Sequence, residues 1–294
     1  MSQQAFTGTG VAIITPFRED GSVDFKSLEK LLQHVTGNGV DYIVALGTTG
    51  ESVTLSKDEK KAIVNFVVDV INKQIPVVVG MGGNNTQDVI NSIKSWDFEG
   101  IDAILSVAPF YNKPSQRGIF LHFKSIADVS PVPVIIYNVP GRTGSDINAE
   151  TTVRLSKEVK NIVAIKEASG NMSQIMHILK NKPKNFKVLS GDDLLTLPMI
   201  ALGGSGVISV IANAYPKEYS DMVRFALAGE ITQACDLHYK MLEMIRAIFT
   251  EGSPSGIKAV LEIMGISGNH LRLPLTPVTQ EHYNKIASMV KKLQ

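Results

Sequence analysis

The sequence predicts an α/β fold, a (β/α)8 TIM barrel over residues 1–229, with a C-terminal three-helix extension over residues 230–294. Three observations carry this prediction. Short apolar, β-rich segments recur eight times, amphipathic segments separate most of them, and the strand pattern stops after about residue 229. Apolar strands alternating with helices are typical of a parallel sheet covered by helices on its outside.

The eight expected strands lie within short runs that are apolar almost throughout. The runs are GVAIITPF (10–17), DYIVALG (41–47), IPVVVGMGG (75–83), IDAILSVAP (101–109), VPVIIYNVP (132–140), NIVAIKEAS (161–169), FKVLSGDD (186–193) and GVISVIAN (206–213). A doubly wound open sheet is the structural alternative. Its usual glycine fingerprint, G-x-G-x-x-G, is missing after the first run, which continues as IITPFRED. We therefore favour the closed barrel.

Helices are expected between the strands and after the last one. Residues 23–39 place Leu28, Leu31, Leu32 and Val35 on one helical face. Residues 56–72 open with a serine followed three positions later by a glutamate, which is the pattern of a capping box. Three further helices are expected in the extension, over 230–250, 255–266 and 279–294.

Composition excludes several classes of protein. A formal net charge of +1 gives no basic excess for non-specific binding to nucleic acid, so no nucleic-acid partner is expected. No apolar run reaches the length of a membrane span, and the start, MSQQAFTGTG, lacks the charged and apolar regions of a signal peptide. Cys235 is the only cysteine, so no disulfide forms within the chain. We expect a cytoplasmic protein without a membrane partner.

Lys166 follows an apolar run at the end of the sixth expected strand, in IVAIKEASG. Side chains alternate along a strand, so Ile162, Ala164 and Lys166 are expected on one face and Glu167 on the other. If Ala164 points into the barrel, so does Lys166. Desolvation would lower the pKa of the amine and leave it neutral enough to attack a carbonyl. The alternative is an ordinary ion-pair partner at the barrel mouth.

Other polar side chains are expected near Lys166, because barrel enzymes keep their chemistry at the carboxyl ends of the strands. Tyr137, one strand away, is either a core aromatic or a proton carrier for the lysine. Thr48 and Thr49, in GTTGE, are either turn residues or a cradle for a small carboxylate.

Other chemistries fit the sequence less well. The six histidines never occur at metal-ligand spacing and are expected in helical stretches, so no metal site is expected. The segment LGGSG (202–206) resembles a phosphate loop, but it precedes the eighth strand and so belongs at the barrel's bottom. Glu51, Glu167, Asp192 and Asp193 offer carboxylates for glycoside cleavage. One tryptophan and 6% aromatic residues are few for sugar platforms. A barrel that merely binds a metabolite remains open.

Six motifs in register carry a resemblance to a known family. They are GTTGES, APFYNKPSQ, IIYNVPGRTG, IVAIKEASG, LSGDD and GGSGVISVIAN. Together they resemble the dihydrodipicolinate synthase family, a lysine-pathway branch of the pyruvate-dependent class I aldolases that include N-acetylneuraminate lyase. The resemblance runs from GTGVAIITPF to RLPLTPVT at 272–279. It implies condensation of pyruvate with L-aspartate 4-semialdehyde to 4-hydroxy-tetrahydrodipicolinate, without a cofactor.

The resemblance also implies catalytic roles. Lys166 matches the imine-forming lysine and Tyr137 the general acid and base. Thr48 matches the hydroxyl that links two tyrosines in a proton relay. Tyr111 matches the second tyrosine, which in the family reaches into a neighbouring subunit. A homo-oligomer is therefore expected, and a dimer of dimers is the family's usual form.

Four residues match substrate-binding positions of the family. Thr49, Gly191 and Ile208 match the pyruvate pocket, and Arg142 matches the arginine that holds the carboxylate of the semialdehyde. Sialic-acid lyases typically lack an arginine at the position of Arg142, and they carry Ser-Thr in place of Thr48-Thr49. An N-acetylneuraminate lyase, or another Schiff-base 2-keto-acid aldolase, remains the alternative.

Many members of the family are inhibited by L-lysine bound in a cleft. The corresponding positions in this sequence are Ser52, Lys57, Lys60, Asn84, Asp88 and Phe110. Lysines stand where sensitive members carry histidines, which adds positive charge near a cationic ligand. Phe110 stands in place of a tyrosine and removes a hydroxyl that can hydrogen-bond the ligand. We expect little or no sensitivity to lysine.

Overall fold

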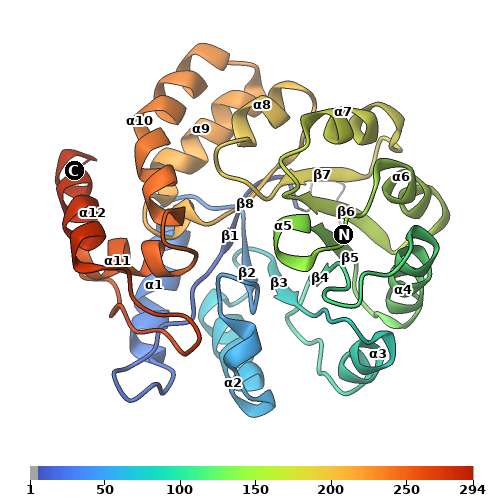
Figure 1. Cartoon of the computed structure of the whole chain (residues 1–294), viewed down its shortest axis with the longest axis horizontal. Helices are drawn as coiled ribbons and strands as arrows, with labels where there is room; N and C mark the ends of the chain where they lie inside the picture. The colour runs from blue at the N-terminus through green and yellow to red at the C-terminus, as the bar shows by residue number, and fades with distance from the viewer. Residues whose placement is uncertain (1–5, 294) are drawn as a thin grey trace.

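The computed structural model describes residues 6–293 and contains a closed barrel of eight parallel strands, each hydrogen-bonded to its sequence neighbours (Figure 1). Residues 1–5 and Gln294 lie outside this range. The first five belong to the segment in which no signal peptide is expected, and Gln294 belongs to the last expected helix. The strands are β1 Gly8–Ala12, β2 Tyr42–Ala45, β3 Val77–Gly80, β4 Ala103–Val107, β5 Val134–Asn138, β6 Ile162–Glu167, β7 Lys187–Ser190 and β8 Gly206–Ser209. The predicted barrel is confirmed, since β8 pairs with β1 and closes it.

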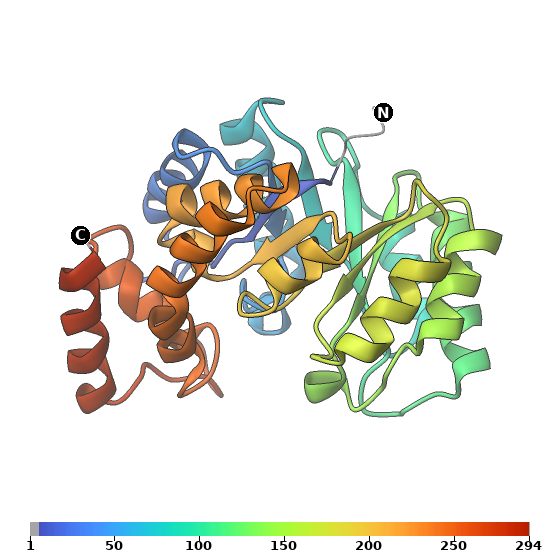
Figure 2. The ribbon, with the colours of Figure 1, turned by 90° about the horizontal axis from the view of Figure 1, so that it is seen from above.

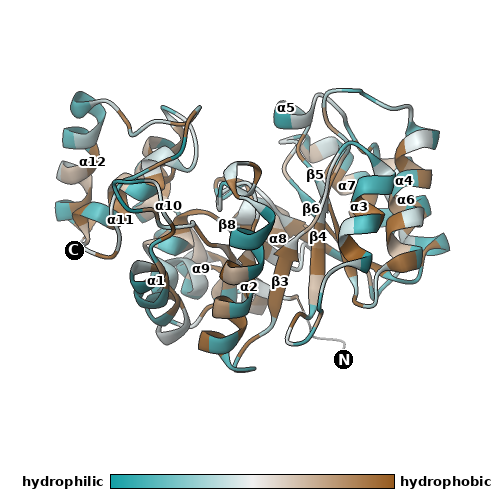
Figure 3. Cartoon of the chain, turned by 90° about the horizontal axis from the view of Figure 1, so that it is seen from below, coloured by the Kyte–Doolittle hydropathy of each residue, from teal (hydrophilic) through white to brown (hydrophobic). Residues whose placement is uncertain are grey.

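Helices surround the barrel (Figure 1). They are α1 Phe25–Gly37, α2 Lys57–Ile71, α3 Thr86–Lys94, α4 Gln116–Val129, α5 Pro140–Thr143, α6 Ala149–Glu158, α7 Met172–Asn181, α8 Thr196–Ala201 and α9 Pro216–Ala228, with 3-10 turns η1 Ser52–Thr54 and η2 Ile211–Asn213. The predicted apolar face of α1 is buried, and Ser56 and Glu59 form both hydrogen bonds of a capping box at the start of α2. The longer helices bury apolar side chains in the core around the strands. Along their ribbons, hydrophobic and hydrophilic residues alternate (Figure 3).

Three helices follow the barrel, as predicted: α10 Ile231–Phe249, α11 Ser255–Ile263 and α12 Gln280–Leu293. In Figure 3, α5 and α12 both lie in the upper part of the view, and Figure 2 shows the extension at one end of the molecule. α5 follows the carboxyl end of β5, so the extension stands beside the barrel face that carries the loops after the strands. The position of a domain boundary near residue 229 stays a prediction.

Strand β6 departs from the predicted alternation at its first residues. The β5–β6 register passes from Val134–Ile162 to Ile135–Ala164, so Val163 is an extra residue in the pairing. Ile162 consequently packs in the outer core, whereas Val163 and Ala164 both pack toward the barrel interior. The expectation that Ile162 shares a face with Lys166 is wrong, because this β-bulge flips the side chains before it. Beyond the bulge the alternation is regular.

The loop 202–205 precedes β8 and lies at the amino-terminal end of that strand, as expected for LGGSG. Among the described helices, none combines the length and apolar character needed to cross a membrane.

Candidate active site

Lys166 lies inside the carboxyl end of the barrel. Its side chain is 5% exposed, and its neighbours in the interior cluster include Tyr137 and Ala164. Burial lowers the pKa of the amine from 10.5 to about 8; the charge of Asp193 opposes this fall and that of Arg142 adds to it. Because a larger fraction of the amine is neutral near pH 7 than for an exposed lysine, Lys166 has the character of a nucleophile.

Tyr137 faces Lys166 from the neighbouring strand. The β5–β6 register pairs the two residues directly, and the Lys166 Nζ lies 4.4 Å from the centroid of the Tyr137 ring. Burial raises the pKa of the phenol, while the charge of Arg142 and a hydrogen bond with the Thr48 side chain lower it. The arrangement brings a proton-carrying hydroxyl, a threonine hydroxyl and an amine together at one end of the barrel.

Gly191 and Asp193, in the loop after β7, lie close to the lysine side chain. A Cβ atom added to Gly191 would lie 2.7 Å from the Ala168 Cβ and 3.0 Å from the Lys166 Cε, so only glycine leaves the lysine its present position. Asp193 is 2% exposed, and its Oδ2 accepts hydrogen bonds from the backbone N–H groups of Val210 and Ile211, at 3.1 and 2.9 Å. Its carboxylate therefore supplies a fixed charge close to the amine.

A cavity of about 1160 Å³ opens beside these groups. Its lining includes Thr48, Tyr137, Arg142 and Lys166, which the sequence analysis selected for catalysis and substrate binding. The same cavity is lined by all six residues of the possible regulatory site: Ser52, Lys57, Lys60, Asn84, Asp88 and Phe110. The structure thus brings three of the four catalytic candidates and all six regulatory candidates to one cavity.

The remaining candidates are not among the residues that line this cavity. Thr49 is buried within the loop after β2, and Ile208 belongs to the barrel-interior cluster that also holds Tyr137. Tyr111 is 88% exposed, and its backbone has a φ of 70°, in the left-handed region. Its neighbour Phe110 lines the cavity, whereas Tyr111 does not.

One buried cluster was not found from the sequence. Glu51 and Lys258, which are 1% and 0% exposed, form an ion pair between the loop after β2 and helix α11. Two hundred residues separate them in the chain, so spacing gives no signal. The available clue was the segment SGIKAVLEI, in which Lys258 is a single charge among apolar neighbours.

The carboxylates considered for glycoside cleavage do not form a pair across the cavity. Glu51 is engaged by Lys258. Glu167 faces the helix layer, as predicted, and accepts hydrogen bonds from Asn138 and from the backbone of Ser169. Asp193 is bound by backbone N–H groups. The acid–base arrangement of a glycosidase is therefore not assembled by these residues.

Five of the six histidines lie in helices, but His270 lies in the loop between α11 and α12, which corrects the expectation of helices for all of them. Within residues 6–293, no three histidine, cysteine or acidic side chains gather in an arrangement that would hold a metal ion. The chemistry that the described groups themselves support is attack of a neutral amine on a carbonyl, with a phenol nearby to move protons.

Comparison with known proteins agrees with this geometry. A 4-hydroxy-tetrahydrodipicolinate synthase of Flavobacterium psychrophilum is 51% identical over 290 residues, which cover 99% of this chain and 99% of the relative. A chloride-inhibited dihydrodipicolinate synthase of Acinetobacter baumannii, solved in complex with pyruvate, matches with a TM-score of 0.95 and 40% identity, over 98% and 99% of the two chains. A structure described as a monomeric dihydrodipicolinate synthase variant matches with a TM-score of 0.96 and 36% identity, over 98% and 97%.

The model of the dihydrodipicolinate synthetase family matches residues 5–293, which is nearly the whole chain. Barrel, extension and lysine site are all included in this match. The chain belongs to the dihydrodipicolinate synthetase family.

Proposed function

We propose that this protein condenses pyruvate with L-aspartate 4-semialdehyde to give 4-hydroxy-tetrahydrodipicolinate, in the route to diaminopimelate and lysine. The observation that carries the proposal is the buried Lys166, whose pKa is lowered to about 8 and whose amine lies beside the Tyr137 ring. Membership of the family supports the choice of substrates, as does the activity in the name of the Flavobacterium relative. We also propose a cytoplasmic location, in keeping with the single cysteine.

The first half of the reaction makes a nucleophile from pyruvate. The neutral amine of Lys166 attacks the ketone, and Tyr137 carries protons as water leaves and an imine forms. The protonated imine withdraws electrons, so the methyl group loses a proton and becomes an enamine. Proton transfer by a positioned side chain typically contributes about 10²–10⁴-fold to a rate. Tyr137 suits this role because it is buried beside the amine and its pKa responds to Thr48.

The second half joins the two substrates. The enamine carbon attacks the aldehyde of the semialdehyde and forms the new carbon–carbon bond. The amine of the semialdehyde then displaces Lys166 from the imine carbon, which closes the ring and frees the enzyme. In this proposal Arg142 binds the carboxylate of the semialdehyde, since it lines the same cavity and carries the matching charge. Thr48, Thr49, Gly191 and Ile208 surround pyruvate.

We further propose that Tyr111 completes the proton relay of a neighbouring subunit. Its 88% exposure supports donation across an interface. A dimer would then be the smallest fully active unit, and a dimer of dimers the expected assembly. A fully active monomer in ultracentrifugation with parallel assays would contradict this role.

We propose that L-lysine is a weak effector or none at all. The cavity brings Lys57 and Lys60 near Asn84 and Asp88, so a cationic ligand would meet two positive side chains and one acidic one. Phe110 offers it no hydroxyl. Burial lowers the pKa of Lys60.

The function is tested by two measurements. Incubation with pyruvate and borohydride should attach one pyruvate-derived group to Lys166, detected by mass spectrometry of the peptide. Turnover of pyruvate should then be faster with aspartate semialdehyde than with N-acetylmannosamine. Failure to form the adduct would refute the imine mechanism, whereas a preference for N-acetylmannosamine would favour the neuraminate lyase alternative.

A further inference from the structure

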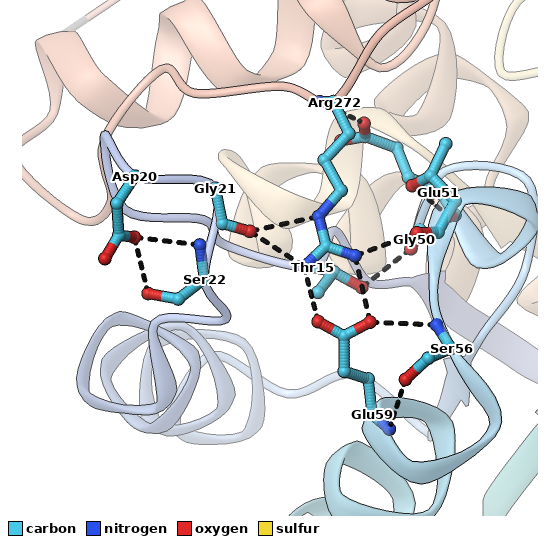
Figure 4. A network of polar contacts seen from close by, with 10 residues as sticks. Thr15, Asp20, Gly21, Ser22, Gly50, Glu51, Ser56, Glu59 and Arg272 are labelled. Carbon is cyan, nitrogen blue, oxygen red and sulfur yellow. Dashed lines mark hydrogen bonds and ion pairs between the residues drawn. The ribbon is translucent and has the colours of Figure 1, made fainter.

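Glu51 ends the loop that carries Thr48 and Thr49, and the C-terminal extension holds its carboxylate. Oε1 accepts a hydrogen bond from the Lys258 Nζ at 2.5 Å, and Oε2 accepts one from the backbone N–H of Arg272 at 3.2 Å. Figure 4 shows the Arg272 side chain extending past Glu51 toward Glu59 and the backbone of Gly21. Both carboxylate oxygens of Glu51 are thus fixed from outside the barrel.

The surroundings of Lys258 show that this contact is specific. Its Nζ also donates to the backbone oxygen of His270 at 2.8 Å, and it lies 4.3 Å from the centroid of the Phe17 ring. Burial lowers the pKa of this amine to about 8, and the charge of Glu51 opposes the fall. A buried ion pair is a poor way to gain stability, because apolar replacements of similar volume often stabilise as well or better. Stability alone therefore does not explain why this ion pair is buried here, and a role in positioning the backbone is the alternative.

The turn formed by residues 48–51 has a conformation that the Glu51 side chain can stabilise. The backbone N–H of Glu51 donates to the carbonyl of Thr48 at 3.1 Å, and the hydroxyl of Thr15 donates to the carbonyl of Gly50 at 2.7 Å. Glu51 has a φ of 51° and a ψ of 35°, a left-handed conformation that is unfavourable for a residue other than glycine. Its anchored side chain counters the tendency of the turn to relax. Because Glu51 and Thr48 share a hydrogen bond, relaxation would move Thr48.

We propose that Glu51 and Lys258 are positioning residues, through which the C-terminal extension keeps Thr48 in the wall of the cavity that it shares with Tyr137. The extension thus takes part in catalysis without touching the substrate. The inference rests on the proposed function where turnover is measured. The state of Tyr137, however, can be followed without any substrate.

The first test measures the pKa of Tyr137 by NMR, with ¹³C-labelled tyrosine and the signal assigned through Tyr137→Phe. Since the Thr48 side chain lowers this pKa, displacing that side chain should raise it. Lys258→Met should raise the pKa in the same direction as Thr48→Val. The double variant Thr48→Val/Lys258→Met should show no further rise of the Tyr137 pKa, because both substitutions remove the effect of the same Thr48 side chain. An unchanged pKa in Lys258→Met, or additive shifts in the double variant, would overturn the proposal.

The second test measures kcat and KM in the same cycle. Lys258→Met should lower kcat by about tenfold or more, within the range of a proton-transfer contribution, and change the KM for pyruvate less. In the Thr48→Val background the same substitution should have little further effect on kcat. Full additivity would refute a shared role. If the unsubstituted protein does not turn over these substrates, the proposed function fails, while the NMR result still decides the positioning role.

Ile286→Ala is the matched control. Ile286 is fully buried in α12, so its truncation weakens the same extension without touching Glu51 or Lys258. Below its unfolding temperature this variant should keep both kcat and the Tyr137 pKa. If it lost activity to the same extent as Lys258→Met, general destabilisation would explain both results and the proposal would fall. If Lys258→Met does not fold, Glu51→Gln replaces it in the test, because glutamine keeps the shape of the side chain. Glu51→Gln should also raise the Tyr137 pKa. An unchanged Tyr137 pKa in Glu51→Gln would overturn the proposal.

Discussion

The folded protein should become more stable at neutral pH when Lys166 is replaced by methionine. Lys166 is 5% exposed, and burial lowers the pKa of its amine from 10.5 to about 8. A group whose charged form is disfavoured by folding costs the folded state free energy wherever that charge is present. Methionine has a similar length, no charge and a flexible side chain that fills irregular space. Lys166→Met should therefore remove the cost and abolish catalysis.

The size and pH range of the effect follow from the two pKa values. A fall from 10.5 to about 8 corresponds to about 3 kcal/mol, since each pKa unit is worth about 1.4 kcal/mol. Between pH 8 and 10.5 the unfolded chain binds the proton and the folded chain has released it, so the stability of the lysine form rises with pH there. Below pH 8 both states are protonated and the full cost is present. The advantage of Lys166→Met should thus be about 3 kcal/mol at pH 7 and shrink toward pH 10.5.

Urea denaturation of both proteins at pH 7 and near pH 10 measures this difference. Lys157→Met, at an exposed position on α6, serves as the control and should change stability by less than about 0.5 kcal/mol at either pH. The reasoning is refuted if Lys166→Met is less stable than the unsubstituted protein at pH 7, or if its advantage is the same at both pH values. Burial of the amine lowers both its pKa and the stability of the folded protein. Either of these refuting results would therefore also weaken the evidence that Lys166 acts as a neutral nucleophile.

Three further substitutions and one titration test the site. Arg142→Ala should raise the KM for the semialdehyde by about tenfold or more, as expected for loss of a charge-assisted contact of about 1.5–3 kcal/mol, and an effect on pyruvate alone would show that the two substrates are misplaced. Tyr111→Phe should lower kcat by about 10²-fold if it removes a proton carrier, with KM values little changed; unaltered turnover would exclude it from the relay. Gly191→Ala should slow borohydride trapping of pyruvate, because its Cβ would lie 3.0 Å from the Lys166 Cε, and trapping at the normal rate would contradict that contact. L-lysine titrated at saturating pyruvate should give no half-inhibition below about 1 mM, an affinity near −4 kcal/mol; tighter inhibition would overturn the reading of Lys57, Lys60 and Phe110.

The fold was predictable because its signals are local and periodic. Each strand is a short apolar run, many helices have an apolar stripe, and some have a recognisable start, as at Ser56 and Glu59. The bulge in β6 has no such signal. Ile162 and Val163 are equally apolar and β-branched, so nothing in their side chains tells which one is the extra residue. The prediction that Lys166 points into the barrel is nevertheless correct. It relies on Ala164, which lies two residues before Lys166 and follows the bulge.

The site was predictable only in part, for a related reason. Lys166 and Tyr137 lie on adjacent strands in direct register, so strand order and alternation suffice to bring them together. Lys258 reaches Glu51 from helix α11, and no pattern of spacing relates a helix of the extension to a loop after β2. Arg272 is harder still, since it lies in the irregular segment between α11 and α12 and contacts Glu51 through its backbone.

These two modes of placement imply different sensitivities to substitution. The amine and the phenol are fixed by backbone pairing inside a closed barrel, so only changes at the residues themselves or at close neighbours such as Gly191 disturb them. Thr48 is on an exposed loop whose conformation includes a left-handed Glu51, and it keeps its place through side chains that belong to another part of the chain. Damage to the extension should therefore slow the proton transfers of the reaction, including those of imine formation, while the amine of Lys166 stays in place. We expect Lys258→Met to bind a full equivalent of pyruvate in borohydride trapping, but to do so more slowly and with a lower kcat.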